Sequence, residues 1–350
     1  MKKTPVIVLN LKFLRVVFLL CTFFTSVLIS TMLSQKLFLP DVPKSFVESC
    51  LCQNPAFFEK SSPEKGVFLL LKKTAIKSPE EETGTQTPPP PKSVESANIS
   101  SRSPAPTMAD TVKINNSTSF AVNSADYNNI PAFLKGDVSV LIVHTHTTES
   151  YTPSQAYSYT PSDTDRTLDK NYNMVRVGNE IKNALSQHGI KVYHDTTIND
   201  YPSYNGSYNK SAVTIANYIK NDPSIQIVLD VHRDAIEGEN GVKVKYTSSI
   251  DGKDAASIML VVGSSISGLT HENWETNMNF AVTLQQYTQT LFSGLCRPIN
   301  FRSQRFNQQL APGAIIVEVG TNGNTLDEAL LGAKYFAQSL AQYIKNAKNQ

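Results

Sequence analysis

Two short polar stretches carry the residue types that could perform metal chemistry. The first, His144–Glu149, has the sequence HTHTTE, and the second, Asp230–Arg233, has the sequence DVHR. Each directly follows an apolar run, residues 138–143 and 225–231, that is typical of a buried β-strand. Catalytic and ligand-binding groups collect at strand ends in α/β sheets. Imidazoles and a carboxylate at such ends suit a catalytic zinc ion, which keeps a fourth position for water.

The spacing within these stretches suggests which side chains would hold the ion. His146 and Glu149 can reach one ion from a single turn, and His232 would supply a third ligand from the neighbouring strand end. His144 competes with His146, because both project to the same side of an extended segment. One would bind the ion and the other would support it. The alternative for each histidine is an ordinary surface or hydrogen-bonded residue.

Glu318 is the candidate catalytic base. It interrupts an otherwise apolar strand, expected at residues 314–319, where an unpaired carboxylate is expensive to bury. Beside a zinc-bound water it would take up a proton as general base and then return it to the leaving amine. The alternative is a structural salt bridge to Arg233, Arg302 or Arg305.

The loop before that strand contains candidate substrate-binding residues. Arg302, Arg305 and Asn307 lie there, and guanidinium groups suit substrate carboxylates. The alternative is a solvated basic loop. A serine triad is less favoured, because Ser150 lacks a nucleophile-elbow pattern. The remaining histidines have no partners at ligand spacing and are expected to be surface or packing residues: His188, His194 and His271.

Strands and helices alternate along the second part of the chain. Strands are expected at 138–143, 191–194, 225–231, 242–246, 258–262 and 314–319, and helices at about 173–188, 211–221, 274–295 and 325–346. Such alternation predicts an α/β fold with a mostly parallel, twisted sheet and helices on both of its faces.

The first part of the chain predicts a membrane anchor and a linker. Residues 16–35 are uncharged and about long enough to cross a bilayer, and basic residues precede them: Lys2, Lys3, Lys12 and Arg15. A cleaved signal peptide is the alternative, but no clear Ala-x-Ala site follows. We therefore expect a cytoplasmic tip and transmembrane helix at 1–36, a juxtamembrane region and disordered Pro/Ser/Thr-rich linker at 37–135, and a catalytic domain outside the cytoplasm at 136–350.

The net charge and the cysteine content argue against a nucleic-acid-binding protein, a disulfide-stabilised domain and a thiolate zinc site. The 350-residue chain has a formal net charge of +2, which gives no electrostatic reason to expect a nucleic-acid partner. Its four cysteines include a single one in the distal region, Cys296. This excludes both a disulfide framework and a thiolate zinc site there.

The order of these motifs resembles the stage II sporulation protein P family. The resemblance covers about residues 138–346 and lies in five segments: His144–Tyr151, Asp230–Asp234, Asn307–Gln308, Pro312–Ala314 and Glu318–Gly320. It implies an α/β fold related to zinc-dependent N-acetylmuramoyl-L-alanine amidases. His232 would match the second metal histidine and Glu318 the catalytic glutamate, while the first histidine stays open. In the wider amidase family the metal glutamate usually lies further from the first histidine than Glu149 does, which leaves Asp169 or Glu180 as substitutes.

The resemblance also implies a function. The expected reaction is cleavage of the amide between muramic acid and L-alanine in peptidoglycan, with an additional cross-link endopeptidase activity. The implied partners are stage II sporulation proteins D and M, which would act with this chain to thin the septal wall during engulfment. The alternative is a non-catalytic peptidoglycan-binding module that positions partner enzymes.

Overall fold

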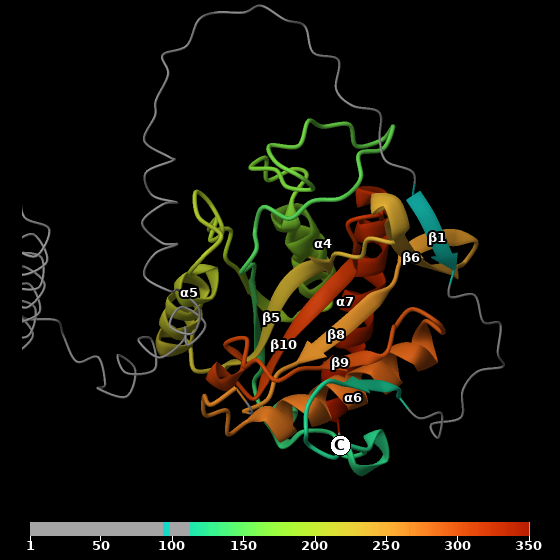
Figure 1. Ribbon diagram of the computed structural model, residues 1–350. Helices are drawn as coiled ribbons and strands as arrows, with labels where there is room; N and C mark the ends of the chain where they lie inside the picture. Colours follow the sequence, from blue (N-terminus) through green and yellow to red (C-terminus); the bar gives the residue numbers. More distant parts are fainter. Residues whose placement is uncertain (1–93, 99–111, 266, 350) are drawn as a thin grey trace, which may run out of the picture. The chain divides into compact units, whose positions relative to one another are not determined.

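A seven-stranded sheet forms the centre of the fold (Figure 1). The computed structural model describes residues 94–98, 112–265 and 267–349. From one edge to the other, the sheet consists of β2 (Ile114–Asn116), β9 (Ile299–Phe301), β8 (Ile258–Val262), β10 (Gly313–Thr321), β5 (Ile225–Asp234), β3 (Ser139–Val143) and β4 (Lys191–His194). All neighbouring strands are parallel except β8 and β10, which run antiparallel.

Helices cover both faces of the sheet, but unequally. One face packs against α4 (Met174–Gln187), α6 (Trp274–Leu291) and α7 (Leu326–Lys348), and the other against α5 (Ser207–Asn221). Figure 1 shows α4 and α7 behind the strands and α5 apart from them, at the left of the view. Alternation along β5 explains the two layers: Leu229 enters the larger apolar core, whereas Val228 packs with Ile215 of α5.

The beginnings of α4 and α7 are set by side chains that satisfy free main-chain N–H groups. Thr325 caps α7, where it forms a reciprocal capping box with Glu328. Asn173 caps α4 by accepting from the N–H of Val175. These caps fix where α4 and α7 begin, and so where their apolar faces meet the sheet.

The structure confirms the predicted α/β fold with its mostly parallel sheet and helices on both faces. Some boundaries differ: β5 continues to Asp234, α5 begins earlier, at Ser207, and α6 ends at Leu291. A second sheet joins β1 (Val94–Asn98), β6 (Lys243–Ile250) and β7 (Lys253–Ala256). The strands that sequence analysis missed, β1, β2, β7 and β9, have three to five residues each, too few to show a clear apolar period.

The first part of the chain is only partly described. Strands β1 and β2 lie within residues 37–135, for which composition predicts a linker; β1 pairs with β6 and β2 with β9. The predicted membrane anchor at residues 16–35 lies outside the described residues. In the described part of the chain, no helix is both long and apolar enough to span a membrane.

Gly332 of α7 marks a close approach between that helix and the main chain of β7, which gives a first prediction. Replacing a helix glycine by alanine normally stabilises a protein by about 1 kcal/mol. Here an added Cβ would lie 2.2 Å from the carbonyl oxygen of Ala256. Gly332→Ala should therefore destabilise the chain, by about 1–3 kcal/mol, because the helix must move away. Thermal or urea unfolding would measure this.

Gly136→Ala is the matched control, because nothing lies within 4 Å of a Cβ at that position. It should leave the unfolding free energy nearly unchanged. A stabilised Gly332→Ala variant would contradict the close packing of α7 on β7.

Candidate active site

Strand order and register bring three predicted parts of the site to one edge of the sheet: the His144–Glu149 segment, His232 and Glu318. β5 lies between β3 and β10 and runs parallel to both. Where β5 pairs with β10, Glu318 is opposite His232. Where β5 pairs with β3, the last residue of β3, Val143, is opposite Asp230. The His144–Glu149 segment therefore continues at the same edge of the sheet. Residues that are partners in parallel strands point to the same face, so Glu318 and His232 are neighbours.

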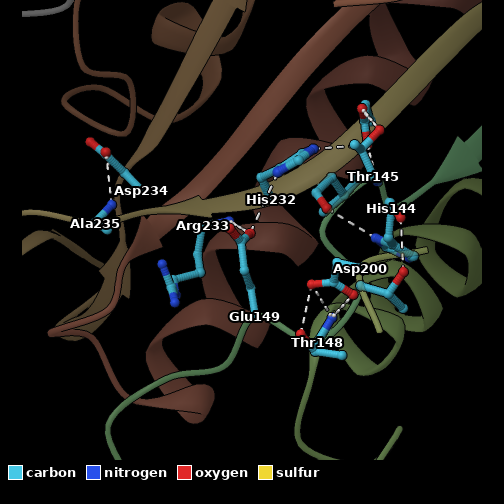
Figure 2. A network of polar contacts seen from close by, with 12 residues as sticks. His144, Thr145, Thr148, Glu149, Asp200, His232, Arg233, Asp234 and Ala235 are labelled. Atoms are coloured by element: carbon cyan, nitrogen blue, oxygen red, sulfur yellow. Dashed lines mark hydrogen bonds and ion pairs between the residues drawn. The ribbon is translucent and has the colours of Figure 1, made fainter. Parts of the chain in front are cut away.

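His146, Glu149 and His232 meet at this edge. The rings of His146 and His232 lie edge to face, with centroids 5.3 Å apart and planes at 84°. Nδ1 of His232 is 3.5 Å from Oε2 of Glu149. Figure 2 shows the Glu149 and His232 side chains pointing toward one another. All three residues are buried, so their interactions are little screened by water.

A second carboxylate orients His232 from its other side. Nε2 of His232 lies 2.9 Å from Oδ1 of Asp230. Asp230 is itself held by Thr145, whose N–H donates to Oδ1 (2.8 Å) and whose hydroxyl donates to Oδ2 (2.6 Å). Burial alone would lower the pKa of His232, but the carboxylates of Asp230 and Glu149 outweigh it and hold that pKa well above its usual value.

Glu149 is strongly stabilised as a carboxylate. Burial acts to raise its pKa, but the positive charge of Arg233 and the contact with His232 lower that pKa to about 2. The main-chain N–H of Arg233 donates to Oε2 at 3.3 Å. Arg166 adds a second cation, with Nη2 at 3.8 Å from Oε1. Glu149 therefore stays ionised at the pH at which proteins usually work.

His144 does not join this cluster, although sequence spacing left it equal to His146. Its Nδ1 is 3.0 Å from the carbonyl oxygen of Val231, and its Nε2 is 2.9 Å from Nε2 of His194. A carbonyl only accepts, so Nδ1 of His144 carries a hydrogen directed toward Val231. Gly178 of α4 makes room for this pair, because a Cβ there would lie 2.5 Å from His194. His144 thus contacts Val231 of β5 and His194 rather than Glu149.

Glu318 presents a free carboxyl oxygen beside His232. The residue is partly exposed, yet its Oε2 is buried and has no hydrogen-bond partner among the described residues. Burial raises the pKa of Glu318 to about 8, against a smaller lowering by His232. The hydroxyl of Tyr151 donates to the carbonyl of Val319 (2.8 Å) and so fixes the strand next to the carboxyl group. The guanidinium of Arg233 is engaged elsewhere, donating to main-chain carbonyls.

Two residues that sequence analysis missed hold the turn before Glu149. Asp200 is buried and accepts from the N–H of Thr148 at 3.1 Å and from its hydroxyl at 2.6 Å. Arg166 donates to the same carboxylate and to the hydroxyl of Thr148. Both residues lie in loops far apart in sequence, with no regular spacing that would have singled them out.

Two tyrosines, also missed, flank His146: Tyr204 in the loop before α5 and Tyr208 in the first turn of α5. The ring of Tyr204 stacks on the His146 ring, with centroids 4.3 Å apart and planes at 6°. The ring of Tyr208 lies edge to face at 5.6 Å. One indication of a shared role for these tyrosines was present in the sequence, namely their spacing of four residues just before a predicted helix. The same spacing is equally typical of residues that pack in a core.

The predicted substrate-binding loop is largely engaged within the protein. The amide of Asn307 donates to the carbonyl of Tyr208 (2.7 Å) and to the hydroxyl of Ser211 (3.1 Å), which fastens the loop to α5. Arg305 is buried and donates to the carbonyl of Thr270 at 2.9 Å. Arg302 is exposed. Their role in substrate binding stays a prediction.

The two substitute ligands considered for Glu149 lie in other surroundings. The carboxylate of Asp169 accepts from Asn171 in an exposed turn, and Glu180 pairs with Arg176 on α4 at 3.3 Å. Neither has a contact with the histidines of the cluster. Glu149 is thus the carboxylate that accompanies His146 and His232.

The imidazole and carboxylate groups of His146, Glu149 and His232 are chemically suited to bind zinc, although their atoms do not yet surround a single point. In the described part of the chain, no group of three or more His, Cys, Asp or Glu side chains is arranged ready to hold a metal. Nδ1 of His146 is buried without a hydrogen-bond partner. The 3.5 Å between His232 Nδ1 and Glu149 Oε2 is close to the separation of about 3.4 Å between ligand atoms in a tetrahedral zinc site. Asp230 on the far side of His232 matches the carboxylate that commonly supports a metal-binding histidine.

The raised pKa of Glu318 predicts how the stability of the metal-free chain depends on pH. In the unfolded chain this carboxyl group ionises near its usual pKa of 4.5, whereas in the folded chain it keeps its proton until about pH 8. At this group the folded state thus holds an extra proton between these values, which makes stability fall as the pH rises. Burial lowers the pKa of His144, His194 and His271 and acts the other way below about pH 6.5. The fall in stability should therefore be measured between about pH 6.5 and pH 8. His232 acts in the same direction, because its raised pKa gives stability that is lost at high pH.

Urea unfolding in the presence of a chelator, at several pH values across this window, would measure the slope. Glu318→Gln should flatten it, because glutamine does not titrate. Equal slopes for the variant and the unmodified chain would show that Glu318 does not titrate abnormally.

Comparisons with known proteins identify the family. The family model described as stage II sporulation protein P matches residues 59–341. Stage II sporulation protein P of Bacillus subtilis (strain 168) is 26% identical over 230 residues, which cover 62% of this chain and 54% of that protein. The chain thus matches about half the length of this curated relative.

Solved structures with partial similarity include two amidases. One is N-acetylmuramoyl-L-alanine amidase from Clostridium difficile 630, with 15% identity, a TM-score of 0.33, and coverage of 61% of this chain and 99% of that one. The other is the catalytic domain of CwlV, an N-acetylmuramoyl-L-alanine amidase from Bacillus (Paenibacillus) polymyxa var. colistinus, with 12% identity, a TM-score of 0.35, and coverage of 59% and 99%. TM-scores below 0.5 do not establish a shared fold, so the assignment rests on the family match: the chain belongs to the stage II sporulation protein P family.

Proposed function

We propose that this protein is a zinc-dependent peptidoglycan hydrolase that cleaves the amide between muramic acid and L-alanine. Family membership supports the general role, and the geometry of the sheet edge supports the chemistry. The single observation that carries the proposal is the position of Glu318. Its unpaired carboxyl oxygen lies beside His232, in a cluster with His146 and Glu149.

The proposed zinc ligands are His146, Glu149 and His232. When bound there, zinc would polarise the scissile carbonyl and lower the pKa of a water molecule to about 7. Asp230 would hold His232 with Nδ1 directed toward the ion. His144 is not among the proposed ligands, because both of its ring nitrogens already have partners.

Glu318 is the proposed general base and acid. It would take the proton from the attacking water and deliver it to the nitrogen of the leaving L-alanine. Burial sets its pKa near neutrality, at about 8, which suits a group that must both accept and return a proton. Tyr151 holds the main chain at Val319 and so limits the movement of Glu318.

The proposed setting follows from the family and from the sequence. An uncleaved anchor at residues 16–35 would place the N-terminus in the cytoplasm and the hydrolase domain outside, at the sporulation septum. There the chain would thin the septal wall during engulfment, together with stage II sporulation proteins D and M. A cross-link endopeptidase activity belongs to the same proposal. Mass spectrometry of the products would separate the two activities.

Metal analysis tests the proposed ligands. His146→Ala and His232→Ala should each lower the zinc content of the purified chain at least tenfold, because each would remove one of three protein ligands. His194→Ala is the control: it removes the partner of His144 and should leave the zinc content unchanged. Loss of zinc in His194→Ala, with retention in His146→Ala, would instead assign the metal to the His144–His194 pair.

A digest of purified sacculi tests the role of Glu318. Glu318→Gln should retain fold and zinc yet release products at least about a hundredfold more slowly, as expected for loss of a general base. A chelator should stop release by the unmodified chain. Undiminished release by Glu318→Gln would refute the assigned role. Binding of sacculi without any turnover, with or without chelator, would support the non-catalytic wall-binding alternative.

A further inference from the structure

The loop that leads into α5 exposes aromatic rings next to the candidate site. Among the described residues, the large apolar side chains that are exposed include two aromatic ones, Tyr201 and Tyr204, each with 56% of its surface accessible. Aromatic rings usually lie in the core, because each removes a large apolar area from water. Exposed ones beside a site often contact a ligand.

Tyr204 lies directly on a proposed metal ligand. One face of its ring stacks on His146 at 4.3 Å, and His146 itself is only 7% exposed. The guanidinium of Arg166 also lies over the Tyr204 ring, 5.1 Å from its centre. More than half of the Tyr204 surface is accessible despite these two neighbours. The exposed ring thus forms part of the rim of the site.

The backbone of this loop is held in place. The hydroxyl of Ser207 donates to the carbonyl of Tyr204 (2.5 Å), and Lys210 donates to the carbonyl of Asn199 (2.7 Å). Asp200 is tied to Thr148 of the metal-binding segment. The ring is therefore presented in a fixed position, which reduces the entropy lost when a ligand binds.

The chemistry of the substrate decides what would contact this ring. This step rests on the proposed function, in which the scissile bond joins a muramoyl sugar to a peptide. The sugar is a six-membered ring with a flat face of C–H groups, and it lies only a few bonds from the reacting carbonyl. The peptide begins with alanine, whose side chain is a single methyl group. A flat aromatic face matches the sugar ring in shape and polarity better than it matches alanine.

We propose that Tyr204 forms a sugar-binding subsite, on which the muramoyl ring of a glycan strand stacks beside the zinc site. The sugar would contact the part of the ring that His146 and Arg166 leave accessible. Tyr204 would thereby position the scissile amide relative to His146, His232 and Glu318, and would favour substrates that carry a sugar over free peptides.

Equilibrium binding of glycan strands stripped of their peptides tests this subsite directly, because such strands have no amide for the chain to cleave. The full chain and three variants would be compared by calorimetry. Tyr204→Phe should bind like the unmodified chain. Tyr204→Leu, which has a similar apolar volume but no flat ring, should bind roughly three- to tenfold more weakly. Val213→Ala, which shortens an exposed apolar side chain on α5, should have no effect.

Free stem peptide provides the second arm of the experiment. Its affinity should be the same for Tyr204→Leu and the unmodified chain. A loss of peptide affinity with unchanged glycan affinity would overturn the proposal and assign the ring to the peptide. Equal glycan affinity in Tyr204→Leu and Tyr204→Phe would also overturn it. Because neither ligand needs to be cleaved, these results stand apart from the sacculus digest that tests the proposed reaction.

Discussion

The parallel pairing of β5 with β10 is the constraint on which the candidate site depends. It sets Glu318 beside His232 on one face of the sheet. The residues before them in each strand, Val231 and Val317, point to the other face and enter the core that packs against α4, α6 and α7. A shift by one residue would exchange the two faces of a strand, and would move the charged groups into the apolar core and the valines into the site. The apolar core that stabilises the fold therefore also fixes the distance between the two reactive groups.

Most buried charges at this edge have compensating partners. Asp230 is held by Thr145 and His232, and Glu149 by Arg166 and the N–H of Arg233. Such matching is needed because an unpaired buried charge is costly. Three atoms at the centre have no hydrogen-bond partner among the described residues: Nδ1 of His146, Nε2 of His232, which faces Asp230 only as an ion pair, and Oε2 of Glu318. Open positions at the centre of a well-satisfied network fit a site that is completed by an ion and a substrate.

The two histidines of the first motif show why spacing alone could not assign the ligands. In an extended strand His144 and His146 would share a face, but residues 145–148 form a turn. The hydroxyl of Thr147 donates to the carbonyl of His144 and helps to fold the chain back there. His144 consequently meets His194 next to α4, whereas His146 meets Tyr204 next to α5. Asn307 is a similar case. Its side-chain amide donates a hydrogen bond to the carbonyl of Tyr208 in α5, and no periodicity in the sequence indicates this contact.

The sequence by itself determined the fold class, most of the longer strands and helices, and the three segments that meet at the site. These features arise from apolar periodicity and from capping residues, which act between near neighbours. Only the tertiary structure decided which histidine faces Glu149, that Asp230 orients His232, and that Arg166, Asp200 and Tyr204 belong to the same surroundings. Most of those contacts join segments that lie tens of residues apart, whereas Asp230 and His232 are two residues apart in β5. Their geometry depends on strand order and on turns, which leave no local period in the sequence.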